Sequence, residues 1–196
     1  MKALVIYDTN FGNTKMIAGA IAKELGKDAK AKSVSDFNVR EIKGIDLLVA
    51  GSPIVGWKPS EKMEAFLATL GKDRLKGIKA ASFDTRVKIF IHGDAAKKIS
   101  QKLKEAGAEI ITDPQAFYVR GKEGPLFEGE REKAMEWARK LKTDCVIIQI
   151  CCCMRFFNVH NMLILKGRFT EMLRILQNPS DFPSRPFEVS RRMTFL

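Results

Sequence analysis

The sequence predicts an α/β fold in which five parallel strands form a sheet between two layers of helices, followed by a C-terminal appendage. Short apolar, β-branched segments alternate with amphipathic segments along residues 1–142, at a spacing that favours parallel pairing and right-handed crossovers. The composition agrees, because 45% hydrophobic and 29% charged residues are typical of a globular domain and exclude a disordered or fibrous chain.

The first strand and the first helix have the clearest patterns. Residues 2–8 form a short apolar run, typical of a buried strand. Residues 13–25 place Ile17, Ile21 and Leu25 on one helical face, and Gly26 ends this helix. A second strand is predicted over residues 29–33.

The middle of the chain repeats the alternation. Residues 46–51 are predicted as the third strand, since Pro53 follows their apolar run. Residues 60–70 are predicted as a helix with Phe66 and Leu67 inward, and residues 79–83 as the fourth strand.

The last elements of the predicted domain are a helix, an interrupted strand and a second helix. A helix over residues 94–106 ends before Gly107. The fifth strand lies within residues 109–119 and is expected to break near Pro114, because proline lacks an amide donor. Residues 129–141 form a helix whose first-turn acids suit the helix dipole.

The chain changes character near Lys142. From Asp144 onward it contains no alanine, and arginine replaces lysine as the main cation. We therefore predict one domain over residues 1–142 and an extension of unknown role over residues 143–196. The extension is either a short accessory element or a non-native stretch such as a shifted reading frame, of which we favour the second. Its expected parts are a strand or apolar tail at 145–154, an amphipathic helix at about 161–177 and loose coil at 181–196.

Charge and cysteine content limit the functional classes. The net charge of +11 favours acidic partners, yet no nucleic-acid-binding motif is recognisable. The chain has no apolar run long enough to span a membrane and no secretory signal, so we expect a cytoplasmic location. The four cysteines do not have the spacing of a metal site and are predicted to be reduced thiols: Cys145, Cys151, Cys152 and Cys153.

Ligands of open parallel sheets bind beyond the carboxyl ends of the strands. This rule directs attention to three predicted loops, at residues 9–14, 52–59 and 84–93. The first loop places hydroxyls, amides and one glycine at the start of a helix, where unpaired backbone amides favour an anion. It contains no lysine, so we predict a monoester phosphate bound by uncharged donors. An ordinary helix start capped by Asn or Thr is the alternative.

Four segments resemble the flavodoxin family. The phosphate-loop signature of this family resembles residues 5–14, which are Val5-Ile6-Tyr7-Asp8-Thr9-Asn10-Phe11-Gly12-Asn13-Thr14, followed by Ala18 and Ile21. Three further segments look like those of a flavodoxin-domain subgroup: Ala50-Gly51-Ser52-Pro53-Ile54, Phe83-Asp84-Thr85-Arg86 and Gly124-Pro125-Leu126-Phe127-Glu128-Gly129-Glu130. The resemblance covers about residues 1–142. It implies a flavodoxin-like three-layer sandwich with strand order 2-1-3-4-5.

The same resemblance implies one non-covalently bound FMN and electron transfer between redox partners through the semiquinone and hydroquinone states of the flavin. The candidate binding residues lie in the three loops: Thr9, Asn10, Phe11, Gly12, Asn13, Thr14, Ser52, Pro53, Ile54, Val55, Gly56, Trp57, Asp84, Thr85 and Arg86.

The second and third loops have more specific expected roles. Trp57 is expected to stack on the flavin ring, and Gly56 can adopt a positive φ that turns a neighbouring carbonyl toward flavin N5. Asp84, Thr85 and Arg86 are expected to begin the third loop and face the polar edge of the flavin, with a turn-forming Asp84 as the alternative. Whether Phe90 covers the ring or packs on the sheet stays open.

An FMN electron carrier with acidic redox partners is therefore the favoured function. Two other classes stay open. One is an FMN-dependent reductase of a quinone or similar small acceptor, although no nicotinamide-binding motif is visible. The other is an interaction module that has lost its flavin. No catalytic or metal-binding residue is predicted.

Overall fold

The computed structural model describes residues 1–88 and 93–155, and the strands in this part of the chain form one twisted sheet. Five of them follow the order β2 (Ala29–Ser33), β1 (Ala3–Tyr7), β3 (Leu47–Val55), β5 (Lys79–Val87) and β6 (Glu109–Ile110), and all neighbours in this series are parallel. β7 (Gln115–Val119) is also parallel to β5, whereas β4 (Lys58–Pro59) is antiparallel to β3. The predicted fourth strand corresponds to β5, and the predicted fifth strand corresponds to β6 and β7 taken as one interrupted strand. With this correspondence, the predicted order 2-1-3-4-5 is confirmed.

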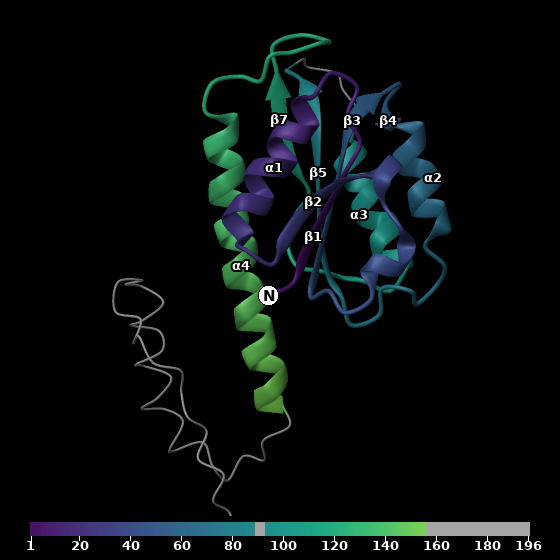
Figure 1. Ribbon diagram of the computed structural model, residues 1–196, viewed down its shortest axis with the longest axis vertical. Coiled ribbons are helices and arrows are strands. Elements are labelled where there is room, and N and C mark those ends of the chain that lie inside the picture. The colour runs from purple at the N-terminus through teal and green to yellow at the C-terminus, as the bar shows by residue number, and fades with distance from the viewer. Residues whose placement is uncertain (89–92, 156–196) are drawn as a thin grey trace, which may run out of the picture. The chain divides into compact units, whose positions relative to one another are not determined.

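Two helices cover each face of this sheet (Figure 1). On one face lie α1 (Asn13–Leu25) and α4 (Glu130–Arg155), and on the other lie α2 (Glu61–Thr69) and α3 (Ala95–Glu105). Two short 3₁₀ helices, Val34–Asp36 and Val39–Ile42, lead from β2 toward β3. The predicted three-layer arrangement is therefore confirmed.

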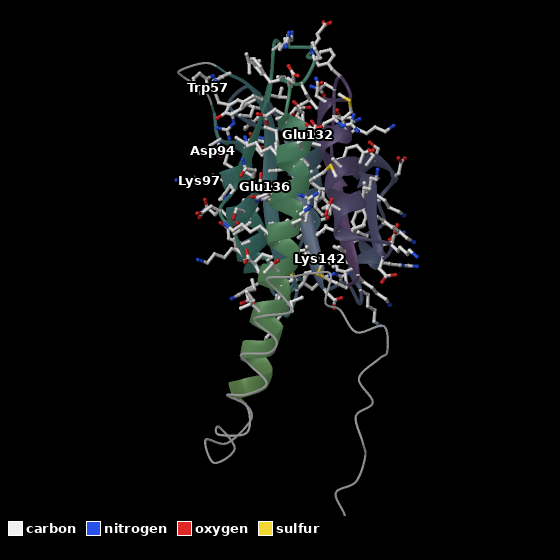
Figure 2. All side chains as sticks on the ribbon, turned by 90° about the vertical axis from the view of Figure 1, so that its left-hand side faces the viewer. Trp57, Asp94, Lys97, Glu132, Glu136 and Lys142 are labelled. Atoms are coloured by element: carbon white, nitrogen blue, oxygen red, sulfur yellow. The ribbon has the colours of Figure 1, made fainter. Side chains whose placement is uncertain are left out.

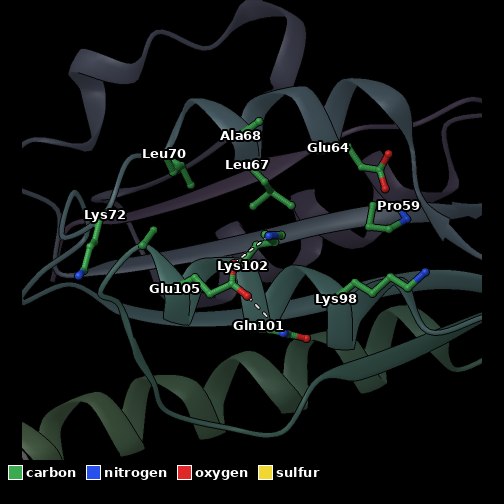
Figure 3. A pocket seen from close by; sticks show the side chains of 11 residues that line it. Pro59, Glu64, Leu67, Ala68, Leu70, Lys72, Lys98, Gln101, Lys102 and Glu105 are labelled. Atoms are coloured by element: carbon green, nitrogen blue, oxygen red, sulfur yellow. Dashed lines mark hydrogen bonds and ion pairs between the residues drawn. The ribbon is translucent and has the colours of Figure 1, made fainter.

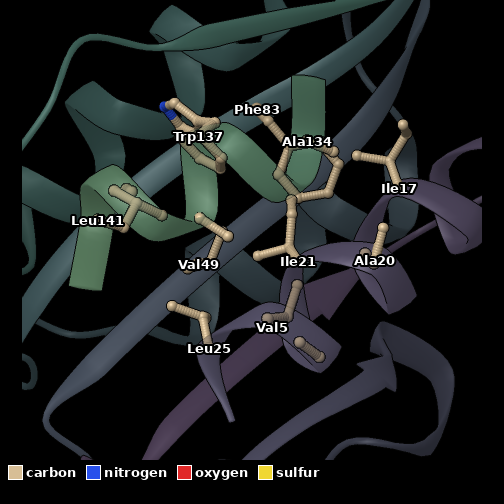
Figure 4. Packing of buried hydrophobic residues seen from close by; sticks show 14 of the residues in the cluster. Val5, Ile17, Ala20, Ile21, Leu25, Val49, Phe83, Ala134, Trp137 and Leu141 are labelled. Atoms are coloured by element: carbon tan, nitrogen blue, oxygen red, sulfur yellow. The ribbon is translucent and has the colours of Figure 1, made fainter. Parts of the chain in front are cut away.

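The core beneath α1 and α4 is built around three aromatic rings. Phe83, Phe117 and Trp137 pack edge to face, with ring centroids 5.8 to 6.3 Å apart. Ile17 and Ile21 of α1 are fully buried against them, and Figure 4 shows this packing. Burial of these side chains holds both helices on the sheet, at roughly 1.5–3 kcal/mol for each large side chain.

A second core lies beneath α2 and α3. Met63, Ile99 and Leu103 are fully buried there, and Phe37 packs edge to face on Phe66 at 5.4 Å. Both cores follow the helical spacing of apolar residues in the sequence.

Two strands are longer than predicted. β3 continues to Val55 and β5 to Val87, so the expectation that residues 52–55 and 84–86 form loops is wrong. The parallel ladder continues through the pairs of Ser52 with Asp84 and of Pro53 with Thr85. Pro53 has no amide hydrogen, but this breaks no hydrogen bond between β3 and β1, because β1 ends opposite Gly51.

α4 is also longer than predicted. It continues to Arg155, so the alternative of a strand at 145–154 is wrong. No Gly or Pro interrupts this stretch, and Trp137, Leu141 and Cys145 follow one another at helical spacing as buried residues. Burial raises the pKa of the free Cys145 thiol to about 11.

The chain divides into two compact units, Met1–Gln149 and Ile150–Leu196. Of the second unit, the structure describes only the last residues of α4, and the elements predicted at 161–177 and 181–196 lie outside the described residues. The domain boundary predicted after residue 142 stays a prediction. In the described residues, none of the helices combines the length and apolar character that a bilayer span requires.

Candidate functional site

A hollow of about 270 Å³ opens at the edge of the sheet where β1, β3, β5 and β7 end. This is the edge at which open parallel sheets bind their ligands. Ten of the fifteen candidate residues line it: Thr9, Asn10, Phe11, Asn13, Thr14, Pro53, Ile54, Val55, Gly56 and Thr85. Val87, Val119 and Lys122 also line it and were not predicted.

The start of α1 presents backbone donors to this hollow. Gly12 occupies the N-cap position with φ +86°, and no side chain caps the helix there. The alternative of an ordinary Asn- or Thr-capped helix start is therefore wrong. Thr9 instead accepts a hydrogen bond from the Gly12 amide, with 2.9 Å between Oγ1 and N. First-turn amides without a side-chain cap are suited to bind an anion.

Two threonine hydroxyls join the first loop to β5. The Oγ1 atoms of Thr14 and Thr85 lie 2.8 Å apart, and both side chains are buried. Successive residues of a strand point to opposite faces, so Thr85 faces Thr14 while its neighbours face α3. This hydrogen bond orients a hydroxyl at the floor of the hollow.

Asn13 differs from its expected role as a donor within the first loop. Its side-chain Nδ2 donates to the Glu123 carbonyl oxygen at 2.9 Å, 110 positions further along the chain. Asn13 thereby ties the connection after β7 to the start of α1. Gly124 packs against the same side chain with φ +107°, and a Cβ atom there would lie 2.5 Å from Asn13 Nδ2.

Gly124→Ala is therefore expected to lower the free energy of unfolding by about 1–3 kcal/mol, because alanine meets both an unfavourable φ and the Asn13 side chain. Chemical denaturation measures this change. Gly121→Ala is the matched control, since a Cβ at Gly121 would meet no atom of the described residues within 4 Å other than those of its chain neighbours. Equal stability of the two variants would contradict the close packing of Gly124 on Asn13.

A tight β-hairpin forms one wall of the hollow. β3 and β4 are joined by Gly56 and Trp57, with φ of +54° and +70°. Such a pair of positive φ angles is typical of a type I′ turn. Gly56 accepts this conformation readily, whereas a tryptophan in it is strained and was not expected.

Trp57 does not line the hollow. Its side chain is 56% exposed, and its carbonyl oxygen accepts a hydrogen bond from Lys98 Nζ at 3.1 Å. Figure 2 shows Trp57 near Asp94 and Lys97, at the start of α3. The ring is therefore largely open to solvent and is not among the side chains that line the hollow.

Asp84 and Arg86 form a buried ion pair beneath α3. Arg86 Nε donates to Asp84 Oδ1 at 2.6 Å, and Arg86 Nη2 also contacts Asp84 Oδ2 and, at 3.3 Å, Asp94 Oδ1. The Ala96 amide donates to Asp84 Oδ2 at 2.9 Å. The pair therefore anchors the start of α3 and does not line the hollow, contrary to the expectation that both residues face a ligand.

Burial governs the protonation of this pair. It raises the pKa of Asp84, although the hydrogen bonds from Arg86 and from the Ala96 amide act in the opposite direction. Burial by itself would lower the pKa of Arg86, but the hydrogen bond and negative charge of Asp84 raise it. Because Arg86 keeps its proton and lies against the carboxylate, we take the pair as ionised.

Two further candidate residues have local structural roles. Ser52 Oγ accepts a hydrogen bond from the Ser60 amide at 2.9 Å and thereby holds the start of α2. Gly12 supplies the left-handed backbone conformation before α1 but does not line the hollow.

A larger hollow of about 610 Å³ lies between α2 and α3 (Figure 3). Leu67 and Leu70 form part of its floor, and its rim carries charged side chains such as the ion pair of Lys102 with Glu105. Its described lining runs along the two helices and contains no described residue of the loops that follow β1, β5 or β7. We therefore place the functional site at the smaller hollow.

Known proteins share the sequence pattern and the fold of this chain. A family model for flavodoxins matches residues 5–137. The chain belongs to the flavodoxin family. A flavodoxin from Clostridium beijerinckii is 33% identical over 84 residues, which span 40% of this chain and 60% of that relative.

Solved flavodoxin structures have the same fold as this flavodoxin-family chain. A flavodoxin from the domain Archaea superposes with a TM-score of 0.61 at 23% identity, over 74% of this chain and 99% of its own. Flavodoxin 1 from Bacillus cereus superposes with a TM-score of 0.61 at 18% identity, over 74% of this chain and 97% of its own. Rubredoxin oxygen:oxidoreductase from Desulfovibrio gigas has a TM-score of 0.62 at 16% identity, with 74% of this chain matching 36% of that one.

The residues of the hollow fit the cofactor of the family, FMN. Uncharged hydroxyl and amide donors with the uncapped start of α1 suit a phosphate monoester. Ile54 and Val55 of the hairpin offer apolar surface for a flavin ring.

Proposed function

We propose that this chain binds FMN non-covalently in the hollow and carries electrons between redox partners. The observation that carries the proposal is the uncapped start of α1, facing a hollow whose lining combines neutral hydrogen-bond donors with an apolar hairpin. FMN, when bound, supplies the capacity to accept and release electrons singly or in pairs.

The first loop, residues 9–14, binds and orients the cofactor in this proposal and is called the phosphate loop from here on. Thr9, Asn10 and the first-turn amides of α1 are placed to donate hydrogen bonds to a phosphate. Thr14 takes part with its hydroxyl orientation set by Thr85. In this proposal Thr85 is the donor of the contact, so the hydrogen of Thr14 is left for the ligand. The contact holds the Thr14 side chain in place before the ligand arrives, which lowers the entropy cost of binding.

The hairpin shields the ring and offers a carbonyl. Ile54 and Val55 exclude water from one side of the hollow. A backbone carbonyl at Gly56 or its neighbours is proposed to accept a hydrogen bond from flavin N5–H after reduction. The positive φ of Gly56 gives this turn the conformational freedom for such a reorientation.

The partners are proposed to be redox proteins with acidic docking surfaces, because the chain carries a net charge of +11. Exposed Phe11 and Val55 lie at the hollow itself and give a docking face some apolar area. Arg86 pairs with Asp84, and Lys58 pairs with Glu64 at 2.9 Å. Each of these two positive charges is therefore partly neutralised and adds little to the positive electrostatic potential at the site.

Titration of the flavin-free, full-length chain with FMN is expected to release heat, and the purified complex is expected to have the visible absorption of a flavoprotein. Riboflavin, which lacks the phosphate, is expected to bind at least about tenfold more weakly, because it forgoes the charge-assisted contacts of the first loop. Calorimetry with both ligands measures this difference.

Addition of NADH or NADPH to the complex separates the carrier from a reductase. Slow or absent oxidation of the nicotinamide without a partner enzyme supports the carrier, whereas rapid turnover with a quinone supports the reductase. Correctly folded protein that binds neither FMN nor riboflavin would contradict the proposed function.

A further inference from the structure

Lys122 is the charged side chain that the structure brings to the hollow. The other described residues that line it are all uncharged: Thr9, Asn10, Phe11, Asn13, Thr14, Pro53, Ile54, Val55, Gly56, Thr85, Val87 and Val119. The first loop by itself therefore supplies only neutral donors, and the charged residue of the described lining, Lys122, comes from the connection after β7.

This connection has a defined conformation. The Arg120 amide donates to the Pro125 carbonyl at 2.9 Å, and the Gly124 amide donates to the Gly121 carbonyl at 3.2 Å. A β-bridge joins Val119 to Leu126 at its base. These bonds fold residues 120–125 into a closed turn, so the backbone of Lys122 is held in place.

Asn13 then fixes this turn against the phosphate loop. Its Nδ2 donates to the carbonyl of Glu123, the residue that follows Lys122, and Gly124 packs closely on the Asn13 side chain. Asn13 is itself the first residue of α1. The backbone carrying Lys122 is thus tied directly to the helix start that is proposed to bind a phosphate.

The charge of Lys122 is available to a ligand. Among residues 1–88 and 93–155, Lys122 takes part in none of the ion pairs, and its side chain is exposed. A phosphate monoester carries between one and two negative charges at neutral pH. One ammonium group beside neutral donors gives this hollow a preference for the charged over the uncharged form of an otherwise identical ligand.

We propose that Lys122 binds the phosphate of FMN and sets the preference of the site for the phosphorylated flavin. This inference rests on the proposed function, because it assigns a further residue to the same site. It differs from the expectation that uncharged donors alone hold the phosphate.

The test compares FMN and riboflavin binding to full-length wild-type protein and to Lys122→Gln by calorimetry. Lys122→Gln is expected to weaken FMN binding about fivefold, since a solvent-accessible ion pair contributes up to about 1 kcal/mol. Riboflavin affinity is expected to stay within about twofold. The difference between variant and wild type is expected to shrink as salt is raised from about 0.01 to 1 M, because the Debye length falls from about 30 to 3 Å.

Lys15→Gln is the matched control. Lys15 lies in the first turn of α1 and is exposed but does not line the hollow, so this variant removes the same charge near the same loop. It is expected to change FMN affinity by less than about twofold. An equal loss in both variants would assign the effect to the general charge of the protein and overturn the proposal for Lys122.

The outcomes separate this inference from the proposed function. If wild type binds FMN and Lys122→Gln binds it equally well at low salt, the site stands and the role of Lys122 is overturned. If wild type binds neither flavin, both are overturned.

Discussion

Arg86→Met is expected to lower the free energy of unfolding by about 3–5 kcal/mol, because it leaves the carboxyl of Asp84 buried without its ionic partner. Asp84 has no exposed surface. Of its described hydrogen bonds, the variant loses those from Arg86 and keeps the one from the Ala96 amide. Arg86 also contacts Asp94, the N-cap residue of α3, so the start of this helix is expected to loosen. Urea denaturation of wild type and variant measures the loss.

The loss is expected to depend on pH. Burial already raises the pKa of Asp84 above its ordinary value of 3.8, and removal of Arg86 takes away contributions that lower this pKa, so the folded-state pKa rises further. A carboxyl with a raised pKa contributes stability that is fully present below its unfolded-state pKa and is lost as the pH rises through the folded-state pKa. The deficit of Arg86→Met is therefore expected to be small near about pH 4 and larger at about pH 7.

The double variant Asp84→Asn with Arg86→Met tests the cause. Asparagine keeps an oxygen for the Ala96 amide but carries no charge, so the double variant is expected to regain at least about 2 kcal/mol at neutral pH relative to Arg86→Met alone. Equal stability of the single and double variants at neutral pH would show that the buried charge is not the source of the loss.

Asn10→Asp is expected to weaken FMN binding by at least about 30-fold. Asn10 lines the hollow in the phosphate loop, and its exposure allows the substitution without a packing defect. The change replaces an amide donor by a carboxylate of the same size, so the phosphate loses a hydrogen bond and gains a like charge. Calorimetry with FMN measures the loss, and circular dichroism checks that the fold is kept.

Two controls accompany this variant. Riboflavin affinity is expected to change by less than about threefold, because in the proposed site the substituted position faces the phosphate, which riboflavin lacks. Asn38→Asp makes the same isosteric charge change at a helix cap, where Asn38 Oδ1 accepts a hydrogen bond from the Arg40 amide at 3.0 Å, and it is expected to leave FMN affinity unchanged. A parallel loss of both flavins in Asn10→Asp would contradict the assignment of the phosphate position.

Helices and strand centres could be predicted because their signals are local. The spacing of Ile17, Ile21 and Leu25 predicts α1 with its observed bounds, and Gly26 ends it. The break near Pro114 is likewise seen between β6 and β7. The ends of the strands were harder to predict, because polar residues such as Asp84 are typical of loops unless a partner in the folded protein buries them.

The sequence by itself determined the α/β alternation and the first loop at the start of α1, because both depend on residues close together in the chain. The strand order followed from the resemblance. Only the tertiary structure decided that Arg86 neutralises Asp84, that Trp57 is not among the side chains that line the hollow, and that Asn13 holds the turn carrying Lys122. These outcomes depend on contacts between distant segments, such as the hydrogen bond from Asn13 to Glu123 across 110 positions. Side-chain type and local spacing do not specify which distant group a buried polar atom will meet, since that partner is set by how the helices pack on the sheet.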